Sequence, residues 1–232
     1  MKEKKLKIVF FGTPDFAVAS LETLLQSGHD IAAVVTGPDK PAGRGKHLME
    51  SAVKQAATRH NIPVLQPEKL KNEDFVNTLR QIGADLFIVI AFRMLPEVVW
   101  TMPPLGTFNL HASLLPRYRG AAPINWAIIN GDTETGVTTF FLKHEIDTGD
   151  VIQQEKISIG PDDDAGTIHD RLMELGARLT LETVENIAGG NLSPIPQDMI
   201  DNGLKPSPAP KIFKETCRID WTRKAADVRN LI

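Results

Sequence analysis

Hydrophobic and polar positions follow alternating strand and helix patterns along the first half of the chain. Short apolar runs typical of buried strands occur at residues 6–11, 30–36, 61–65 and 84–91. Between them, apolar positions recur at helical spacing at residues 16–25, 51–59 and 74–81. Strands that alternate with helices predict an α/β fold, with a doubly wound, mostly parallel sheet covered by helices on both faces. In such a sheet ligands bind beyond the carboxyl ends of the strands, so we expect functional residues there.

The second half of the chain has a less regular pattern. Residues 107–111 form another predicted strand that ends in polar side chains. A long loop follows as far as Pro123, which is suited to begin a helix. Further elements are expected as two strands at residues 137–142 and 151–157 and a long helix at residues 167–187.

Composition and charge narrow the class of protein. The longest apolar run, at residues 86–92, is too short to cross a membrane, and the lysines near the N-terminus precede only a strand-length apolar run, which is not a signal peptide. The single cysteine, Cys217, excludes an internal disulfide and a cysteine-based zinc site. The formal net charge of −3 argues against a protein that coats nucleic acid without sequence preference. We therefore expect a cytoplasmic protein with no membrane partner and no bound metal.

One predicted loop concentrates positive charge. Residues 37–48 contain three glycines, two prolines and the cations Lys40, Arg44 and Lys46, against the single acidic residue Asp39. Long loops without secondary structure are uncommon in compact domains, so this length favours a functional role. We expect an exposed, mobile loop that presents cationic side chains.

Three polar residues are the strongest candidates for chemistry. Asn109 and His111 lie two apart on a predicted strand, so their side chains share one face. Two interpretations are open: the two side chains form part of a functional site, or they only make hydrogen bonds to the backbone of a nearby loop. Asp147 belongs to an Asp-Thr-Gly-Asp sequence that is also typical of a turn. A carboxylate beside an imidazole would hold its tautomer and raise its basicity, but sequence alone does not show that Asp147 and His111 meet. The segment after the first strand lacks Gly-x-Gly-x-x-Gly, which disfavours a bound NAD or FAD.

Six segments together resemble a known enzyme family. They are residues 12–17, 41–46, 109–111, 113–123, 147–150 and 218–221. In this order they are similar to the methionyl-tRNA formyltransferases, within the wider 10-formyltetrahydrofolate-dependent formyltransferases. The Pro-Ala-Gly-Arg-Gly-Lys and Leu-Leu-Pro-Arg-Tyr-Arg-Gly-Ala-Ala-Pro segments are the ones specific to the tRNA enzymes. The Asn, His and Asp residues are shared by all formyltransferases of this kind.

The resemblance implies a Rossmann-like formyltransferase fold. It implies transfer of a formyl group from 10-formyltetrahydrofolate to the free amino group of methionyl-initiator tRNA, in support of translation initiation, without a metal. The site residues that it implies are Asn109, His111 and Asp147 for catalysis, Ser113, Leu114, Leu115 and Pro116 for the folate, and Lys40, Arg44 and Lys46 for the tRNA. We expect the enzyme to be a monomer.

The end of the chain has the composition of a linker. Five of the sixteen prolines lie between Pro194 and Pro210, and a new helical pattern begins at Asp220. We therefore expect residues 1–200 to form the catalytic domain. Residues 201–232 are expected to be a linker and the start of a truncated C-terminal domain, which in the family is a β-barrel that also touches tRNA.

The chain departs from the family pattern at a few positions, and other functions remain open. Tyr118 stands where tryptophan is usual, and residues 91–96 differ from the usual loop, which leaves the pterin contacts open. A glycinamide ribonucleotide formyltransferase would carry a glycine-rich phosphate loop where this chain has residues 13–15. The loop around Arg44 opposes a sugar-nucleotide formyltransferase. A non-catalytic ligand-binding module would be supported if the three candidate catalytic residues lay far apart.

Overall fold

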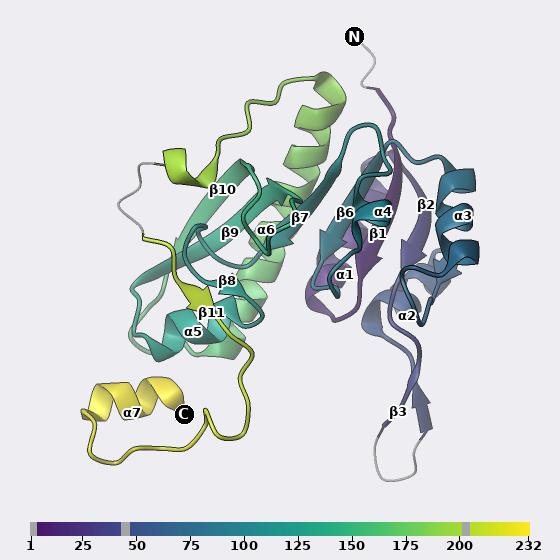
Figure 1. Cartoon of the computed structure of the whole chain (residues 1–232). Coiled ribbons are helices and arrows are strands. Elements are labelled where there is room, and N and C mark those ends of the chain that lie inside the picture. Colours follow the sequence, from purple (N-terminus) through teal and green to yellow (C-terminus); the bar gives the residue numbers. More distant parts are fainter. Residues whose placement is uncertain (1–3, 43–46, 201–204) are drawn as a thin grey trace.

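The computed structural model describes residues 4–42, 47–200 and 205–232. Within these residues, seven strands form a central sheet with the order β10-β9-β7-β6-β1-β2-β5 (Figure 1). The strands are β1 (Lys7–Gly12), β2 (Asp30–Val35), β5 (Val64–Leu65), β6 (Leu86–Ile90), β7 (Thr107–His111), β9 (Glu134–Phe141) and β10 (Val151–Ser158). The first five of these run parallel, whereas β9 pairs antiparallel with both β7 and β10. The predicted α/β class with a mostly parallel sheet is confirmed.

Helices cover both faces of this sheet, as the alternation of elements predicts. The helices of the described residues are α1 (Phe16–Gln26), α2 (Ala52–Arg59), α3 (Glu73–Ile82), α4 (Glu97–Trp100), α5 (Pro123–Ile129), α6 (Ala165–Gly189) and α7 (Ala225–Leu231). One hydrophobic core joins α1, α2 and α6 to the face of β1 that carries Phe10. A second core joins α3 and α4 to the opposite face, which carries Phe11. Successive strand residues point to opposite faces, so these two phenylalanines are both fully buried in different cores.

The basic loop has more structure than its sequence indicates. Lys40–Ala42 (β3) and His47–Met49 (β4) pair as an antiparallel hairpin that projects from the body of the molecule (Figure 1). The expectation of a loop without secondary structure is therefore wrong for these residues, because the cross-strand pairing has no strong signal in so polar a sequence. Asp39 fixes the base of the hairpin, since it accepts hydrogen bonds from Lys54 and, at 2.7 Å, from Gln66. The bond from Lys54 lowers the pKa of the Asp39 carboxyl.

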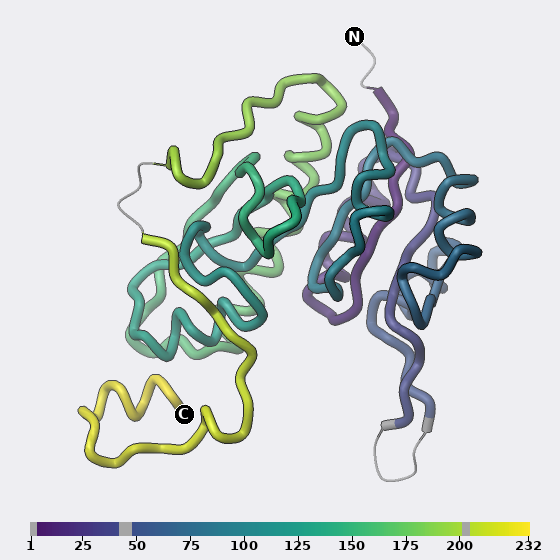
Figure 2. The backbone as a smooth tube through the Cα atoms, in the orientation of Figure 1, coloured from purple at the N-terminus to yellow at the C-terminus, as the bar shows by residue number. Residues whose placement is uncertain are grey.

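The part of the chain predicted to be a linker contributes to the packed body. After α6 comes a short 3₁₀ helix, η1 (Gln197–Met199), and residues 205–210, here called the return segment, then run beside the loop that follows β7 (Figure 2). There β11 (Pro208–Ala209) pairs in parallel with β8 (Arg119–Gly120), and Ala209 is completely buried. The packed body therefore extends beyond the predicted boundary at residue 200.

No helix that the structure describes combines the length and the apolar character needed to cross a membrane.

Candidate active site

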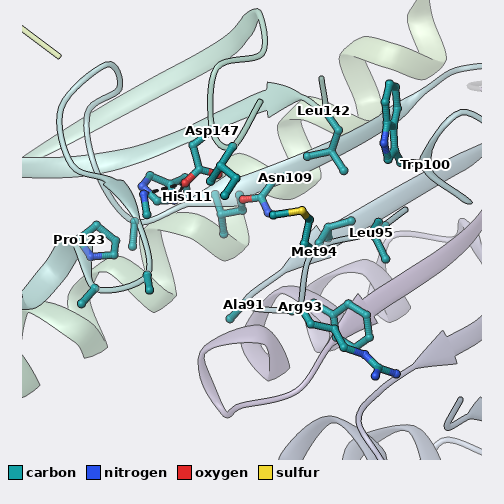
Figure 3. A pocket seen from close by; sticks show the side chains of 18 of the residues that line it. Ala91, Arg93, Met94, Leu95, Trp100, Asn109, His111, Pro123, Leu142 and Asp147 are labelled. Atoms are coloured by element: carbon teal, nitrogen blue, oxygen red, sulfur yellow. Dashed lines mark hydrogen bonds and ion pairs between the residues drawn. The ribbon is translucent and has the colours of Figure 1, made fainter. Parts of the chain in front are cut away.

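A cavity of about 830 Å³ opens beyond the carboxyl ends of β6 and β7, where a parallel sheet is expected to bind its ligand. This volume lies within the range of small-molecule sites, roughly 300–1,000 Å³. His111 and Asp147 lie side by side in it, and Asn109 lies next to them (Figure 3). The remaining wall is largely apolar and includes Phe92, Met94, Leu95, Trp100, Leu142 and Ile146. The three predicted catalytic residues are thus brought together at the polar end of one cavity.

The position of β7 in the sheet aims Asn109 and His111 into this cavity. Leu110, between them, faces the opposite side and packs in the core against α6. Gly176 of α6 makes this contact possible, because a Cβ atom there would lie 2.6 Å from a methyl carbon of Leu110. Alternation along the strand then directs the two neighbouring side chains toward the cavity. Within the described part of the chain, the Asn109 carboxamide has no hydrogen-bond partner, so it is available to a ligand.

His111 is held in one tautomer by the main chain. Its Nε2 atom lies 2.8 Å from the carbonyl oxygen of Tyr118, and the residue is 7% exposed. A carbonyl oxygen only accepts hydrogen bonds, so Nε2 carries a hydrogen in every protonation state. In the neutral ring the lone pair is therefore on Nδ1, which faces Asp147 Oδ2 at 3.8 Å. Any proton gained by the ring is taken up at Nδ1, beside the carboxylate.

Asp147 lies in a turn within the loop of residues 142–150, which connects β9 and β10. Its Oδ2 atom accepts a hydrogen bond of 2.8 Å from the backbone N–H of Gly120. Gly149, two residues later, lies so close to β9 that a Cβ atom there would be 1.5 Å from the carbonyl oxygen of Phe141. Only glycine fits this approach, and it fixes the turn against the sheet.

Unusual backbone conformations gather around the cavity. Among the described residues, four that are not glycine have positive φ angles, and three of these belong to the site: Ala91 (φ 47°), Tyr118 (φ 60°) and Asp147 (φ 53°). A left-handed conformation costs a non-glycine residue about 1–3 kcal/mol and persists only where surrounding contacts impose it. The backbone here is strained where it places the His111 acceptor and the Asp147 carboxylate.

Similarity to known proteins extends along most of the chain. A model of the formyl transferase family matches residues 6–184. The chain belongs to the formyl transferase family. Over all 232 residues it is 61% identical to the methionyl-tRNA formyltransferase of Bacteroides fragilis, and it spans 72% of the length of that relative.

Two solved structures share the formyltransferase fold of this chain. An N-formyltransferase from Helicobacter canadensis, in complex with folinic acid and dTDP-3-aminofucose, has a TM-score of 0.70 at 21% identity, over 98% of this chain and 79% of that one. Glycinamide ribonucleotide transformylase 1 from Symbiobacterium toebii has a TM-score of 0.68 at 18% identity, over 80% of this chain and 89% of that one. At these identities the two structures support the fold alone, and the predicted Rossmann-like formyltransferase fold is confirmed.

The four residues that resemblance to the formyltransferases assigns to the folate do not line the cavity. Ser113 is fully buried, and its hydroxyl donates to the Arg117 carbonyl at 2.7 Å. Leu115 is fully buried as well, with its amide bonded to the Thr138 hydroxyl and its carbonyl to Gln154. Leu114 and Pro116 are their neighbours in the same loop. These contacts support the loop that carries the Tyr118 carbonyl, and direct contact of residues 113–116 with the folate stays a prediction.

Sequence reasoning missed most of the apolar wall of this formyltransferase cavity. Residues 91–96 all line it, and so do residues 142–146. Met94 is 68% exposed and Ile146 57% exposed, although both are large and apolar. Their position in loops at the carboxyl edge of the sheet was the signal available for finding them.

Of the three residues expected to meet tRNA, the structure describes only Lys40. Lys40 is exposed on β3 of the hairpin and does not line the cavity. Arg44 and Lys46 lie outside the described residues. Across residues 4–42, 47–200 and 205–232, no group of three or more histidine, cysteine, aspartate or glutamate side chains is arranged to hold a metal ion.

Proposed function

We propose that this formyltransferase transfers the formyl group of 10-formyltetrahydrofolate to the free amino group of methionyl-initiator tRNA, and that it works as a cytoplasmic monomer. The observation that carries the chemistry is the meeting of Asn109, His111 and Asp147 at one end of the cavity. Their convergence opposes a non-catalytic binding module. The choice of tRNA as acceptor is supported by the identity of 61% to a methionyl-tRNA formyltransferase along the whole chain.

Asn109 is suited to stabilise charge on the formyl oxygen. The folate supplies a formyl carbon bound to nitrogen, and as the new carbon–nitrogen bond forms, an electron pair of the C=O bond moves to oxygen. A hydrogen-bond donor already aimed into the cavity stabilises this charge without reorganising. The carboxamide of Asn109 meets this requirement, because it lines the cavity and has no partner among the described residues.

His111 is suited to move the proton. The attacking amine must lose a proton, and the folate nitrogen must gain one as its bond to carbon breaks. The Nδ1 lone pair can accept the first proton, because Nε2 already donates to Tyr118. The protonated ring faces the Asp147 carboxylate, which stabilises it until the proton passes to the leaving nitrogen. No covalent bond to the protein is needed, and Cys217 does not line the cavity.

The rest of the cavity fits the folate. A pterin ring is flat and largely apolar on its faces, and the wall that includes Met94, Trp100 and Leu142 offers matching side chains next to the polar end (Figure 3). We assign the pterin to this wall, with the formyl group toward Asn109.

The hairpin of β3 and β4 is suited to meet the tRNA. Lys40 is exposed on it, and the sequence between its strands carries Arg44 and Lys46. Cationic side chains on a projecting hairpin contact phosphates and orient a nucleic acid without coating it. This accounts for tRNA binding by a chain whose net charge is −3.

A panel of acceptors tests the proposed function. The protein is incubated with 10-formyltetrahydrofolate and, separately, with methionyl-initiator tRNA, glycinamide ribonucleotide or a dTDP-linked amino sugar. We expect formylation of the tRNA with kcat/KM at least about 10⁴-fold above either other acceptor, since a site built around one acceptor leaves polar groups unpaired with another. Faster formylation of the sugar or the ribonucleotide would overturn the assignment of the acceptor.

A further inference from the structure

Gln197 joins three separate segments next to the site. It lies in η1, outside the segments that carry the predicted catalytic residues, and its side chain is buried, with the residue 5% exposed. Its Nε2 atom donates to the main-chain carbonyls of Asp147, at 2.8 Å, and Gly149, at 2.9 Å. Its Oε1 atom accepts from Nε and Nη2 of Arg119, at 3.1 and 2.6 Å. Both the nitrogen and the oxygen of this side-chain amide therefore have hydrogen-bond partners within the protein.

The surrounding groups allow this amide only one orientation. A guanidinium group only donates and a carbonyl oxygen only accepts, so the amide oxygen must face Arg119 and the amide nitrogen must face the turn. The fixed amide brings together two carbonyls that otherwise repel each other. One of them belongs to Asp147, whose φ of 53° requires support from its surroundings. Gln197 supplies that support at the residue where the strain is located.

The hydrogen-bond partners of Gln197 belong to the two segments that contact the two ring nitrogens of His111. On one side, the amide holds the Asp147 turn, whose carboxylate faces Nδ1 at 3.8 Å. On the other side it holds Arg119, which directly follows Tyr118, the residue whose carbonyl binds Nε2. Gly120, next in the chain, donates its N–H to Asp147 Oδ2. The two groups that orient the imidazole are thus connected to each other through one buried side chain.

We propose that Gln197 is a positioning residue for formyl transfer, which holds the Asp147 carboxylate and the Tyr118 carbonyl in register around His111. This inference rests on the proposed function, because it assumes that His111 and Asp147 move the proton. Gln197 does not line the cavity, so it acts on turnover through Asp147 and not through binding of either substrate.

The first test separates turnover from binding. Gln197→Met keeps the length of the side chain and removes its hydrogen bonds, whereas Gln197→Glu keeps an acceptor for Arg119 and places an oxygen against the two carbonyls. We expect both variants to lower kcat about 10–100-fold, as small displacements of reacting groups do, with KM for folate and for tRNA within about twofold. Gln153→Met is the matched control, because Gln153 uses both ends of its amide on Thr183 and Glu182, away from the cavity. It should keep kcat within about twofold, as expected for a site that does not touch the reacting groups.

The second test asks whether Gln197 acts through Asp147. In an Asp147→Asn background, adding Gln197→Met should lower kcat by a clearly smaller factor than it does in the native background, because coupled residues are not additive and only the effect on the Tyr118 carbonyl remains. A Gln197→Met substitution that lowers kcat by the same factor in both backgrounds would overturn the proposal. If the Gln197→Met protein does not fold, a native kcat in the Gln197→Glu protein would overturn it as well. Native turnover in Asp147→Asn alone would instead overturn the proposed catalytic role and this inference together. If the Gln197 variants keep native turnover while Asp147→Asn loses it, only the positioning role of Gln197 is overturned.

Discussion

Tyr118 contributes to the site through both its main chain and its side chain. Its carbonyl fixes the tautomer of His111, and its phenol anchors the backbone that carries this carbonyl. The hydroxyl donates to Asp132 Oδ2 at 2.8 Å and accepts from Arg117 at 2.8 Å. Burial raises the pKa of the phenol, which therefore stays protonated and keeps donating to the carboxylate. Tyr118 is thus held in place by hydrogen bonds of both its main chain and its side chain.

Substitutions of Asn109 test the proposed oxyanion donor. Asn109→Ala removes the carboxamide and should lower kcat about 10²–10³-fold, the usual loss for one such donor. Asn109→Asp keeps the shape but replaces the donor by a negative charge, so its kcat should be at least as low. Equilibrium binding of the folate, followed by fluorescence, should change little in Asn109→Ala. Near-normal kcat in both variants at saturating substrates would show that another group stabilises the oxygen.

The sequence predicts part of this residue-scale arrangement. The spacing of two on a strand is enough to predict that Asn109 and His111 share one face. Their meeting with Asp147 was not predictable, because it depends on a positive φ at Asp147 and on the N–H of Gly120, 27 residues away in the chain. Gln197 carried no sequence signal, since a lone glutamine in a proline-rich segment is typical of exposed linkers.

Among the elements, those that carry a local apolar pattern were predictable and those defined by contacts with distant segments were not. The long helix α6 is predicted at 167–187 and found at Ala165–Gly189, because its apolar positions repeat over many turns. Asp164 begins it by accepting a hydrogen bond of 2.7 Å from the N–H of Thr167, which lowers the pKa of that carboxyl. The four-residue α4 and the two-residue strands β8 and β11 were missed, because contacts with distant segments define them and no periodicity can develop.

The hairpin of β3 and β4 makes a prediction of its own. Arg44→Ala should raise KM for tRNA several-fold at low salt and leave KM for the folate unchanged. Loss of one phosphate contact should also reduce the slope of log affinity against log salt by about 1. Arg80→Ala, which removes an exposed arginine from α3, serves as control and should change neither quantity. An Arg44→Ala protein with the native tRNA KM and salt slope would contradict the proposed contact.

At the scale of the whole molecule, the return segment completes the loop that surrounds His111. The N–H of Arg119 and the N–H of Ala121 donate to carbonyls of Ser207 and Ala209 at 2.9 and 2.8 Å. The Ser207 hydroxyl accepts from the N–H of Tyr118 at 3.0 Å. Backbone groups on both sides of the Tyr118 carbonyl are therefore satisfied by residues about 90 positions later, which a reading of local sequence could not supply.

A pair of glycine substitutions tests this long-range support. Gly120 has a φ of 127°, and a Cβ atom there would lie 2.6 Å from the Ala209 carbonyl oxygen, whereas a Cβ on Gly28, with a φ of 85°, meets no atom within 4 Å. Gly28→Ala should lower the free energy of unfolding by about 1–2 kcal/mol, the cost of the left-handed conformation, with native kcat. Gly120→Ala should be more destabilising and should also lower kcat at least about tenfold, because it displaces reacting groups. Urea unfolding and initial rates measure both effects, and equal behaviour of the two variants would rule out a role for the return segment in turnover.

The pairing of β8 with β11 has a consequence for synthesis of the chain. A ribosome makes Asn109, His111, Gly120 and Asp147 well before it makes Gln197 and Ala209. A nascent chain that ends before η1 contains every group assigned to the chemistry, yet lacks those that hold the Asp147 turn and the Tyr118 carbonyl in place. If these residues act as proposed, catalytic competence requires the segment from Gln197 to Ala209, which is synthesised after the whole central sheet.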